Sequence, residues 1–110
     1  MILDFDKMEM QVMKNFKGGE KEVRAKMHVD KNNRIMQGVL IPGASIGLHT
    51  HETNSEIVYV LEGEGKVLYD GEYEIVKAGQ CHYCPKGHSH SFINDSDKDL
   101  VIFAVVPEHE

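Results

Sequence analysis

Two histidines and two carboxylates lie within eight positions of this chain, at His49, His51, Glu52 and Glu56. On a β-strand, His49 and His51 project from the same face, so their imidazoles can bind one metal ion. Glu56 begins an apolar run, where a carboxylate has to be paired or coordinated because a lone buried charge is very costly. A polar surface turn is the alternative, and Glu52 is expected at the rim in either case.

A third histidine follows a turn later in the chain. His90 comes after Pro85-Lys86-Gly87, and the new strand places His90, Phe92 and Asn94 on one face. Three imidazole nitrogens and one carboxylate oxygen leave one or two coordination positions open on an octahedral ion. Open positions allow an ion to bind and polarise a substrate.

Short apolar runs separated by glycines must position these side chains. The chain has 110 residues, enough for one domain with one core, and 10 of them are Gly. No segment shows helical periodicity, so the pattern indicates an all-β jelly roll or small barrel. Strands are predicted over residues 7–14, 23–29, 35–41, 57–61, 66–69, 72–76 and 100–106.

The pattern also predicts local features along the chain. The first strand should carry Met8, Met10 and Val12 on one face, and residues 15–22 should form a loop. Residues 57–61 are almost continuously apolar, which predicts a strand buried on both faces. Asp70-Gly71 supplies the positive φ angles of a tight hairpin turn.

Composition excludes several classes of function. The formal charge of -6 argues against non-specific nucleic-acid binding, which needs a surplus of Lys and Arg. No apolar run approaches the roughly 20 residues that span a bilayer. Acids stand near the N-terminus, where a signal peptide needs a basic region, so we expect a cytoplasmic protein.

Cys81 and Cys84 are the only cysteines. A structural zinc site would need two further ligands at suitable spacing, and a redox pair would need to open a helix. Pro85 and Gly87 follow at once, so no helix can start there. We expect two reduced side chains on a short strand, pointing to opposite faces.

These spaced residues resemble the two sequence motifs of the cupin family. Residues 43–63 contain Gly43, five residues, His49-Thr50-His51, four residues, Glu56, six residues and Gly63. Residues 79–94 contain Gly79, five residues, Pro85-Lys86-Gly87, two residues, His90, three residues and Asn94. The resemblance implies that residues 1–110 form a single cupin domain, which is a double-stranded β-helix jelly-roll barrel.

The resemblance also implies which residues bind a metal ion and which partners the protein has. It implies that His49, His51, Glu56 and His90 bind one divalent transition-metal ion, which could be Mn, Fe, Co, Ni, Cu or Zn. It implies a small-molecule ligand or substrate and a homodimer. From the charge and composition we expect no nucleic-acid or membrane partner.

Further residues are candidates for the surroundings of this site. Glu56 is not free to act as a base if it binds metal, so His82, Tyr83 or a hydroxide on the ion are the candidate bases. His28 and His88 are expected to face solvent or the rim, and Asn94 to hold a turn. The candidates for the pocket wall are Cys84, Phe92 and Phe103.

Fold alone does not select a reaction. Our first hypothesis is a metal-dependent isomerase, lyase or dioxygenase acting on a small oxygenated substrate, such as a sugar acid or a dicarbonyl. The alternative is a non-catalytic domain in which the metal fixes a small ligand for binding or sensing.

Overall fold

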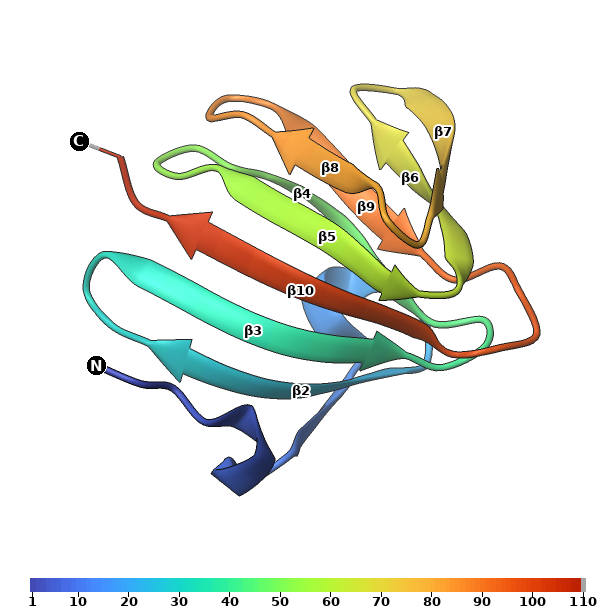
Figure 1. Cartoon of the computed structure of the whole chain (residues 1–110). Coiled ribbons are helices and arrows are strands. Elements are labelled where there is room, and N and C mark those ends of the chain that lie inside the picture. The colour runs from blue at the N-terminus through green and yellow to red at the C-terminus, as the bar shows by residue number, and fades with distance from the viewer. Residues whose placement is uncertain (110) are drawn as a thin grey trace.

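Strands make up most of the computed structural model, which describes residues 1–109 (Figure 1). Two short 3-10 helices, η1 (Phe5–Lys7) and η2 (Phe16–Gly18), lie near the N-terminus. The strands are β1 (Gln11–Lys14), β2 (Glu22–Val29), β3 (Asn33–Leu40), β4 (Ser45–Thr50), β5 (Glu56–Glu62), β6 (Glu64–Tyr69), β7 (Glu72–Lys77), β8 (Cys81–Cys84), β9 (Ser89–Ile93) and β10 (Leu100–Pro107).

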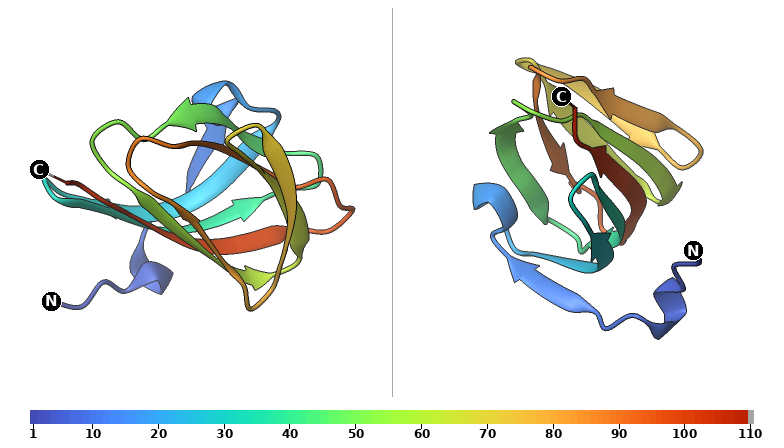
Figure 2. Two further views of the ribbon diagram at one scale, coloured as in Figure 1. Left: turned by 90° about the horizontal axis from the view of Figure 1, so that it is seen from above. Right: turned by 90° about the vertical axis from the view of Figure 1, so that its left-hand side faces the viewer.

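Two antiparallel sheets pack as a jelly roll. The larger sheet has the order β1-β2-β3-β10-β5-β8, and the smaller has the order β4-β9-β6-β7. Figure 2 shows the two sheets around a shared interior, with the N-terminal segment outside it. Among residues 1–109, no helix is both long enough and apolar enough to cross a membrane. The predicted all-β fold is therefore confirmed.

The core lies between the sheets and is built by strict alternation along the strands. On β10, Leu100, Ile102 and Ala104 are at most 1% exposed, while the residues between them are only partly buried. Other strands add further side chains to the same interior. These are Val23, Ala25, Met36, Leu40, Ile46, Val58, Val60, Val67, Val76 and Phe92.

The hairpin predicted around Asp70-Gly71 is present. β6 and β7 pair from Tyr69↔Glu72 to Glu64↔Lys77. Asp70 has a φ of 47° and Gly71 a φ of 87°, as a two-residue turn between right-twisted strands requires.

The prediction that residues 57–61 are buried on both faces is wrong. Val58 and Val60 face the core at 2% and 0% exposure, but Ile57, Tyr59 and Leu61 are each at least 40% exposed. The outer face of β5 has no covering layer among the described residues. The apolar run over residues 57–61 therefore supplies both core side chains and an apolar outer surface on β5.

The predicted N-terminal strand over residues 7–14 is only half correct. The side chain of Asp4 accepts a hydrogen bond from the backbone N–H of Asp6, which starts the turn η1, and β1 begins only at Gln11. Val12 is 53% exposed, whereas Met13 packs against the core. The face assigned from Met8, Met10 and Val12 is therefore wrong, because Met8 and Met10 precede the strand and Met13 is the partly buried residue of β1.

The predicted loop at residues 15–22 is wound into η2, which packs directly against β4. Asn15 and Lys17 have positive φ angles of 51° and 56°. A Cβ added at Gly47 would lie 2.0 Å from the carbonyl oxygen of Lys17, so only glycine allows this approach. The contact brings Lys17 close to the strand that carries His49.

Replacing Gly47 with Ala should force η2 away from β4. We expect the free energy of unfolding to fall by at least about 2 kcal/mol, because backbone and not a flexible side chain must move. Urea unfolding measures it, with Leu48→Ala as the matched control, since Leu48 is 60% exposed. Equal stability of the two variants would show that the contact is not tight.

Candidate metal centre

Four side chains with metal-binding atoms meet between the two sheets. His49 on β4 and His90 on β9 are register partners, and His51 follows the end of β4. Glu56 is the first residue of β5 and reaches the group from the larger sheet. The ligand atoms of the four residues all lie within 4.8 Å of one another. The structure therefore brings together the four residues that the sequence selects.

The Nε2 atoms of the three histidines converge on one carboxylate oxygen. Glu56 Oε1 lies 2.9 Å from His90 Nε2, 3.1 Å from His51 Nε2 and 3.8 Å from His49 Nε2. His90 Nε2 is 3.0 Å from His51 Nε2 and 3.2 Å from His49 Nε2. His51, Glu56 and His90 are at most 5% exposed, and the side chain of His49 is 17% exposed.

These separations fit a divalent metal ion. Donors about 2.1 Å from an octahedral ion are about 3.0 Å apart when adjacent, whereas a tetrahedral ion would separate them by about 3.4 Å. Four of the five separations lie between 2.9 and 3.2 Å. Neutral imidazole lone pairs repel one another at that distance, so the group needs a cation or shared protons at its centre.

The other ring nitrogen of each histidine is held by an acceptor. His49 Nδ1 donates to the carbonyl oxygen of Gly47 at 2.7 Å, and His51 Nδ1 donates to Asn54 Oδ1. His90 Nδ1 lies 3.0 Å from Nε2 of His82. Because an amide or carbonyl oxygen can only accept, the protons of His49 and His51 sit on Nδ1, which leaves their Nε2 lone pairs free for a metal. The His82 ring can accept the Nδ1 proton of His90 in the same way.

Charges at the centre favour an ionised carboxylate. Burial alone would raise the pKa of Glu56, but the hydrogen bonds from His49, His51 and His90 outweigh it and hold that pKa well below its usual range. The hydrogen bond to Glu56 raises the pKa of His51 above its ordinary value. A proton on His51 therefore occupies the position that a metal ion would compete for.

His82, predicted as a candidate base, lies inside the barrel behind His90. Burial, followed by the charge of His90, lowers the pKa of His82 to about 4, so its ring is neutral at pH 7 and can accept the His90 proton. His82 contacts the opposite side of the His90 ring from the converging Nε2 atoms. This geometry suits His82 to orienting His90.

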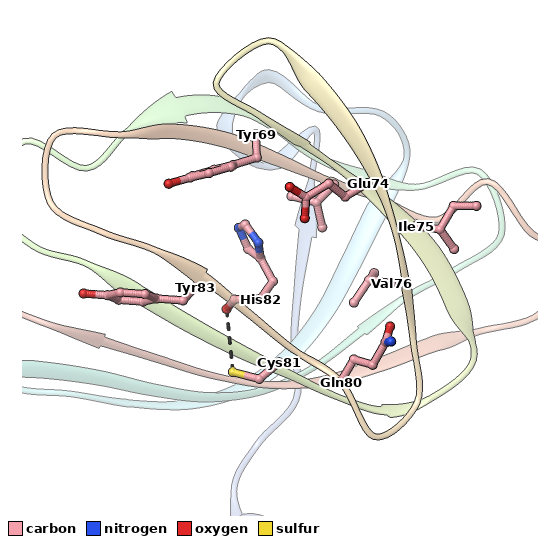
Figure 3. A pocket seen from close by; sticks show the side chains of 9 residues that line it. Tyr69, Glu74, Ile75, Val76, Gln80, Cys81, His82 and Tyr83 are labelled. Atoms are coloured by element: carbon pink, nitrogen blue, oxygen red, sulfur yellow. Dashed lines mark hydrogen bonds between the residues drawn. The ribbon is translucent and has the colours of Figure 1, made fainter.

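Tyr83, the other candidate base, is 55% exposed and lies on the outer side of β8. A hollow of about 470 Å³ opens here beside β7, and Figure 3 shows Tyr69, Glu74 and His82 along its wall. Of the four converging residues, none lines this hollow, since His82 stands between it and His90. Tyr83 is therefore separated from the centre.

The three predicted wall residues have different surroundings. Phe92 is 2% exposed and borders a small space beside His49 and Glu56. Cys84 is fully buried opposite Glu56 in the register, and burial raises its pKa to about 11. Phe103 does not line the site: its ring packs on Phe5 outside the barrel, at 5.8 Å between centroids, because β10 turns Ile102 and Ala104 inward.

His28, His88, the two cysteines and Asn94 lie as the sequence indicates. His28 contacts Asp30 and His88 contacts Asp70, both outside the group of four. Cys81 is exposed and Cys84 is buried, so the two thiols face opposite ways. Asn94 is fully buried, and its side-chain amide donates to the carbonyl oxygens of Leu40 and Lys98.

A second cavity, of about 280 Å³, borders the centre directly. His49 and His51 line it, together with Lys17, Arg34, Glu52 and Asn54. A ligand in this cavity meets the histidines themselves, so the cavity is the natural approach to open positions on an ion. Glu52 is exposed at its rim, as predicted.

Sequence reasoning did not assign Asn54, Arg34 or Lys17 to the site. Asn54 follows His51 by three residues, a spacing at which a turn could have suggested a contact. Arg34 and Lys17 come from β3 and η2, which are distant in sequence, so no local pattern indicates them.

A family model described as "Cupin domain" matches residues 37–106. The chain belongs to the cupin family. This cupin is 34% identical over 113 residues to the "Oxalate-binding protein" of Thermotoga maritima, covering 96% of this chain and 93% of that protein.

Solved structures show the same relationship. A predicted oxalate decarboxylase from Thermotoga maritima superposes with a TM-score of 0.91 at 32% identity, covering 98% of this cupin and 99% of that chain. A Cupin 2 conserved barrel protein from Salinispora arenicola has a TM-score of 0.76 at 25% identity, covering 98% and 88%.

Replacing His82 with Leu should weaken binding of a divalent ion without removing a ligand. We expect about a 10- to 100-fold loss of affinity for Co²⁺, because the Nδ1 proton of His90 loses its acceptor. Competition with a coloured chelator measures the affinity, and Tyr83→Phe on the outer side of β8 is the control. An unchanged affinity in His82→Leu would mean that His82 does not orient His90.

Proposed function

We propose that this cupin holds one divalent transition-metal ion on His49, His51, Glu56 and His90 and binds a small carboxylate at the ion's open positions. The observation that carries the proposal is the convergence of three Nε2 atoms on Glu56 Oε1 while each Nδ1 has a separate hydrogen-bond partner. A surface cluster of polar residues would not need this arrangement.

When bound, the ion supplies positive charge and Lewis acidity to an anionic oxygen ligand. His49, His51 and His90 present neutral nitrogens, and Glu56 offsets one of the two positive charges. Ile46, Val58 and Phe92 close the space beside the group with apolar side chains, which excludes water from that side. The ligand would enter through the cavity that His49 and His51 line.

Oxalate is the first ligand to test, because the relative at 34% identity is named an oxalate-binding protein. Oxalate offers two carboxylate oxygens that can occupy two adjacent open positions of an octahedral ion. A set of four protein ligands leaves room for such a ligand. The identity of the native ion is a separate question that the donor set leaves open, since imidazole and carboxylate suit several divalent ions.

Replacing His51 with Ala should abolish metal binding. Protein purified anaerobically without an affinity nickel column should contain close to one transition-metal ion per chain by elemental analysis, and His51→Ala should contain almost none. His28→Ala is the matched control, because His28 contacts Asp30 away from the centre. Equal metal content in all three proteins would sink the ligand assignment.

A metal-dependent enzyme acting on the same ligand is the second candidate. Its support is Glu52, a carboxylate that lines the cavity beside His49 and His51 without belonging to the converging group. Such a carboxylate can carry a proton to or from a bound acid. Neither His82 nor Tyr83 lines this cavity.

Calorimetry with oxalate separates these candidates. Metal-loaded protein should bind oxalate with one site per chain, and removal of the metal with a chelator should abolish the heat. Oxalate binding by the stripped protein at unchanged affinity would contradict the proposal. Sustained release of formate and carbon dioxide, lost in Glu52→Gln, would select the enzyme.

The expected homodimer and cytoplasmic location stay predictions. The exposed apolar side chains of Ile57, Tyr59 and Leu61 on β5 support self-association, since contiguous apolar patches mark interaction surfaces. We propose that a second copy of the chain covers this face. The predicted absence of nucleic-acid and membrane partners agrees with the formal charge of -6 but is equally untested.

A further inference from the structure

Arg34 places a cation beside the candidate metal centre. It lies on β3 and lines the same cavity as His49 and His51. Its Nη2 is 4.0 Å from Oε2 of Glu56, the carboxylate oxygen that does not face the histidines. The guanidinium is therefore within the length of one small molecule from the point where the Nε2 atoms converge.

The guanidinium of Arg34 forms an ion pair with Glu56 and lies over the ring of Phe16, but its hydrogen-bonding capacity is not filled by the protein. A distance of 4.0 Å to Glu56 is too long for a hydrogen bond. Its Nε is buried and has no hydrogen-bond partner among residues 1–109. Burying the Nε–H donor without an acceptor lowers the free energy of unfolding, so this position of Arg34 costs stability. An anion in the cavity would accept hydrogen bonds from the guanidinium of Arg34.

Lys17 adds a second cation to the cavity. Lys17 and Arg34 both lie against the ring of Phe16, with Nζ of Lys17 5.7 Å and Cζ of Arg34 5.8 Å from its centroid. Phe16 thus contacts both cations through cation-π interactions. Glu52 is the one carboxylate among the residues that line this cavity, and it is exposed.

We propose that Arg34, assisted by Lys17, forms an anion subsite that selects a ligand with a second carboxylate group. The inference rests on the proposed function, because the first carboxylate is held by the metal ion. A divalent ion and Glu56 together keep one positive charge, which a monocarboxylate neutralises. Arg34 and Lys17 leave positive charge for a second carboxylate, and the planar fork of arginine matches a carboxylate in two parallel hydrogen bonds.

A purely structural role for Arg34 leads to a different result. If Arg34 served only to hold Glu56, its loss would lower metal affinity and affect every carboxylate ligand equally. As a subsite, Arg34 discriminates between ligands while the metal stays bound. The test therefore compares a dicarboxylate with a monocarboxylate of similar size on protein whose metal content is known.

The experiment uses Mn²⁺-loaded full-length protein, with oxalate and glycolate as the two probes in calorimetry. Arg34→Gln should keep one metal ion per chain and bind oxalate about 10- to 100-fold more weakly, the loss expected for hydrogen bonds to a charged group. Glycolate affinity should change less than about threefold in the same variant, since glycolate has no second carboxylate. Lys17→Gln, on the exposed turn η2, should cost oxalate a smaller factor.

Arg24→Gln is the matched control, because Arg24 is paired with Glu22 on β2 and does not line the cavity. Unchanged oxalate affinity in Arg34→Gln would overturn the subsite and leave the proposed function intact. Loss of metal from Arg34→Gln, or an equal loss for both acids, would assign Arg34 to holding Glu56 and also overturn it. Failure of the wild-type protein to bind either acid would overturn the proposed function together with the subsite.

Discussion

The buried carboxylate of Glu56 is the constraint on which the rest of the site depends. Glu56 is 4% exposed, and an isolated charge at such depth would be very costly. Three imidazoles surround one of its oxygens, and Arg34 lies beyond the other. The group is stable only with positive charge at its centre, so a divalent ion and the protons that replace it at low pH compete for one place.

The jelly roll positions this charge by combining both sheets. The pairing of β4 with β9 fixes His49 opposite His90, while β5 brings Glu56 from the larger sheet. Backbone and side-chain acceptors then fix the ring orientations through Nδ1, so the donors are set before an ion arrives. Close packing of η2 on β4 at Gly47 extends the same framework to Lys17 at the mouth of the cavity.

Much of the fold and the four converging residues could be predicted from sequence, because both depend on local patterns. The strand over residues 100–106, the Asp70-Gly71 turn and the spacing of His49, His51 and Glu56 are each read within a few residues. Contacts between distant segments could not be predicted in this way. Arg34 beside Glu56 is one such contact, and the outward turn of Phe103 onto Phe5 is another.

Two predictions of which strand face is buried were wrong, one for β1 and one for β5. The strand β1 begins only at Gln11, and Met13, not Val12, packs against the core. The apolar run in β5 predicted two buried faces, yet Ile57, Tyr59 and Leu61 are exposed. Hydrophobicity alone does not distinguish a core face from a surface that a partner covers.

The most direct test of the metal centre is a titration with cobalt(II) followed by visible absorption under anaerobic conditions. The arrangement predicts saturation at one ion per chain, with the weak absorption of a six-coordinate ion bound by nitrogen and oxygen. Intense bands of a four-coordinate tetrahedral ion would contradict the open positions for an anion, and sulfur-to-cobalt bands from Cys84 beside Glu56 would contradict the ligand set. So would an absorbance that rises without reaching saturation.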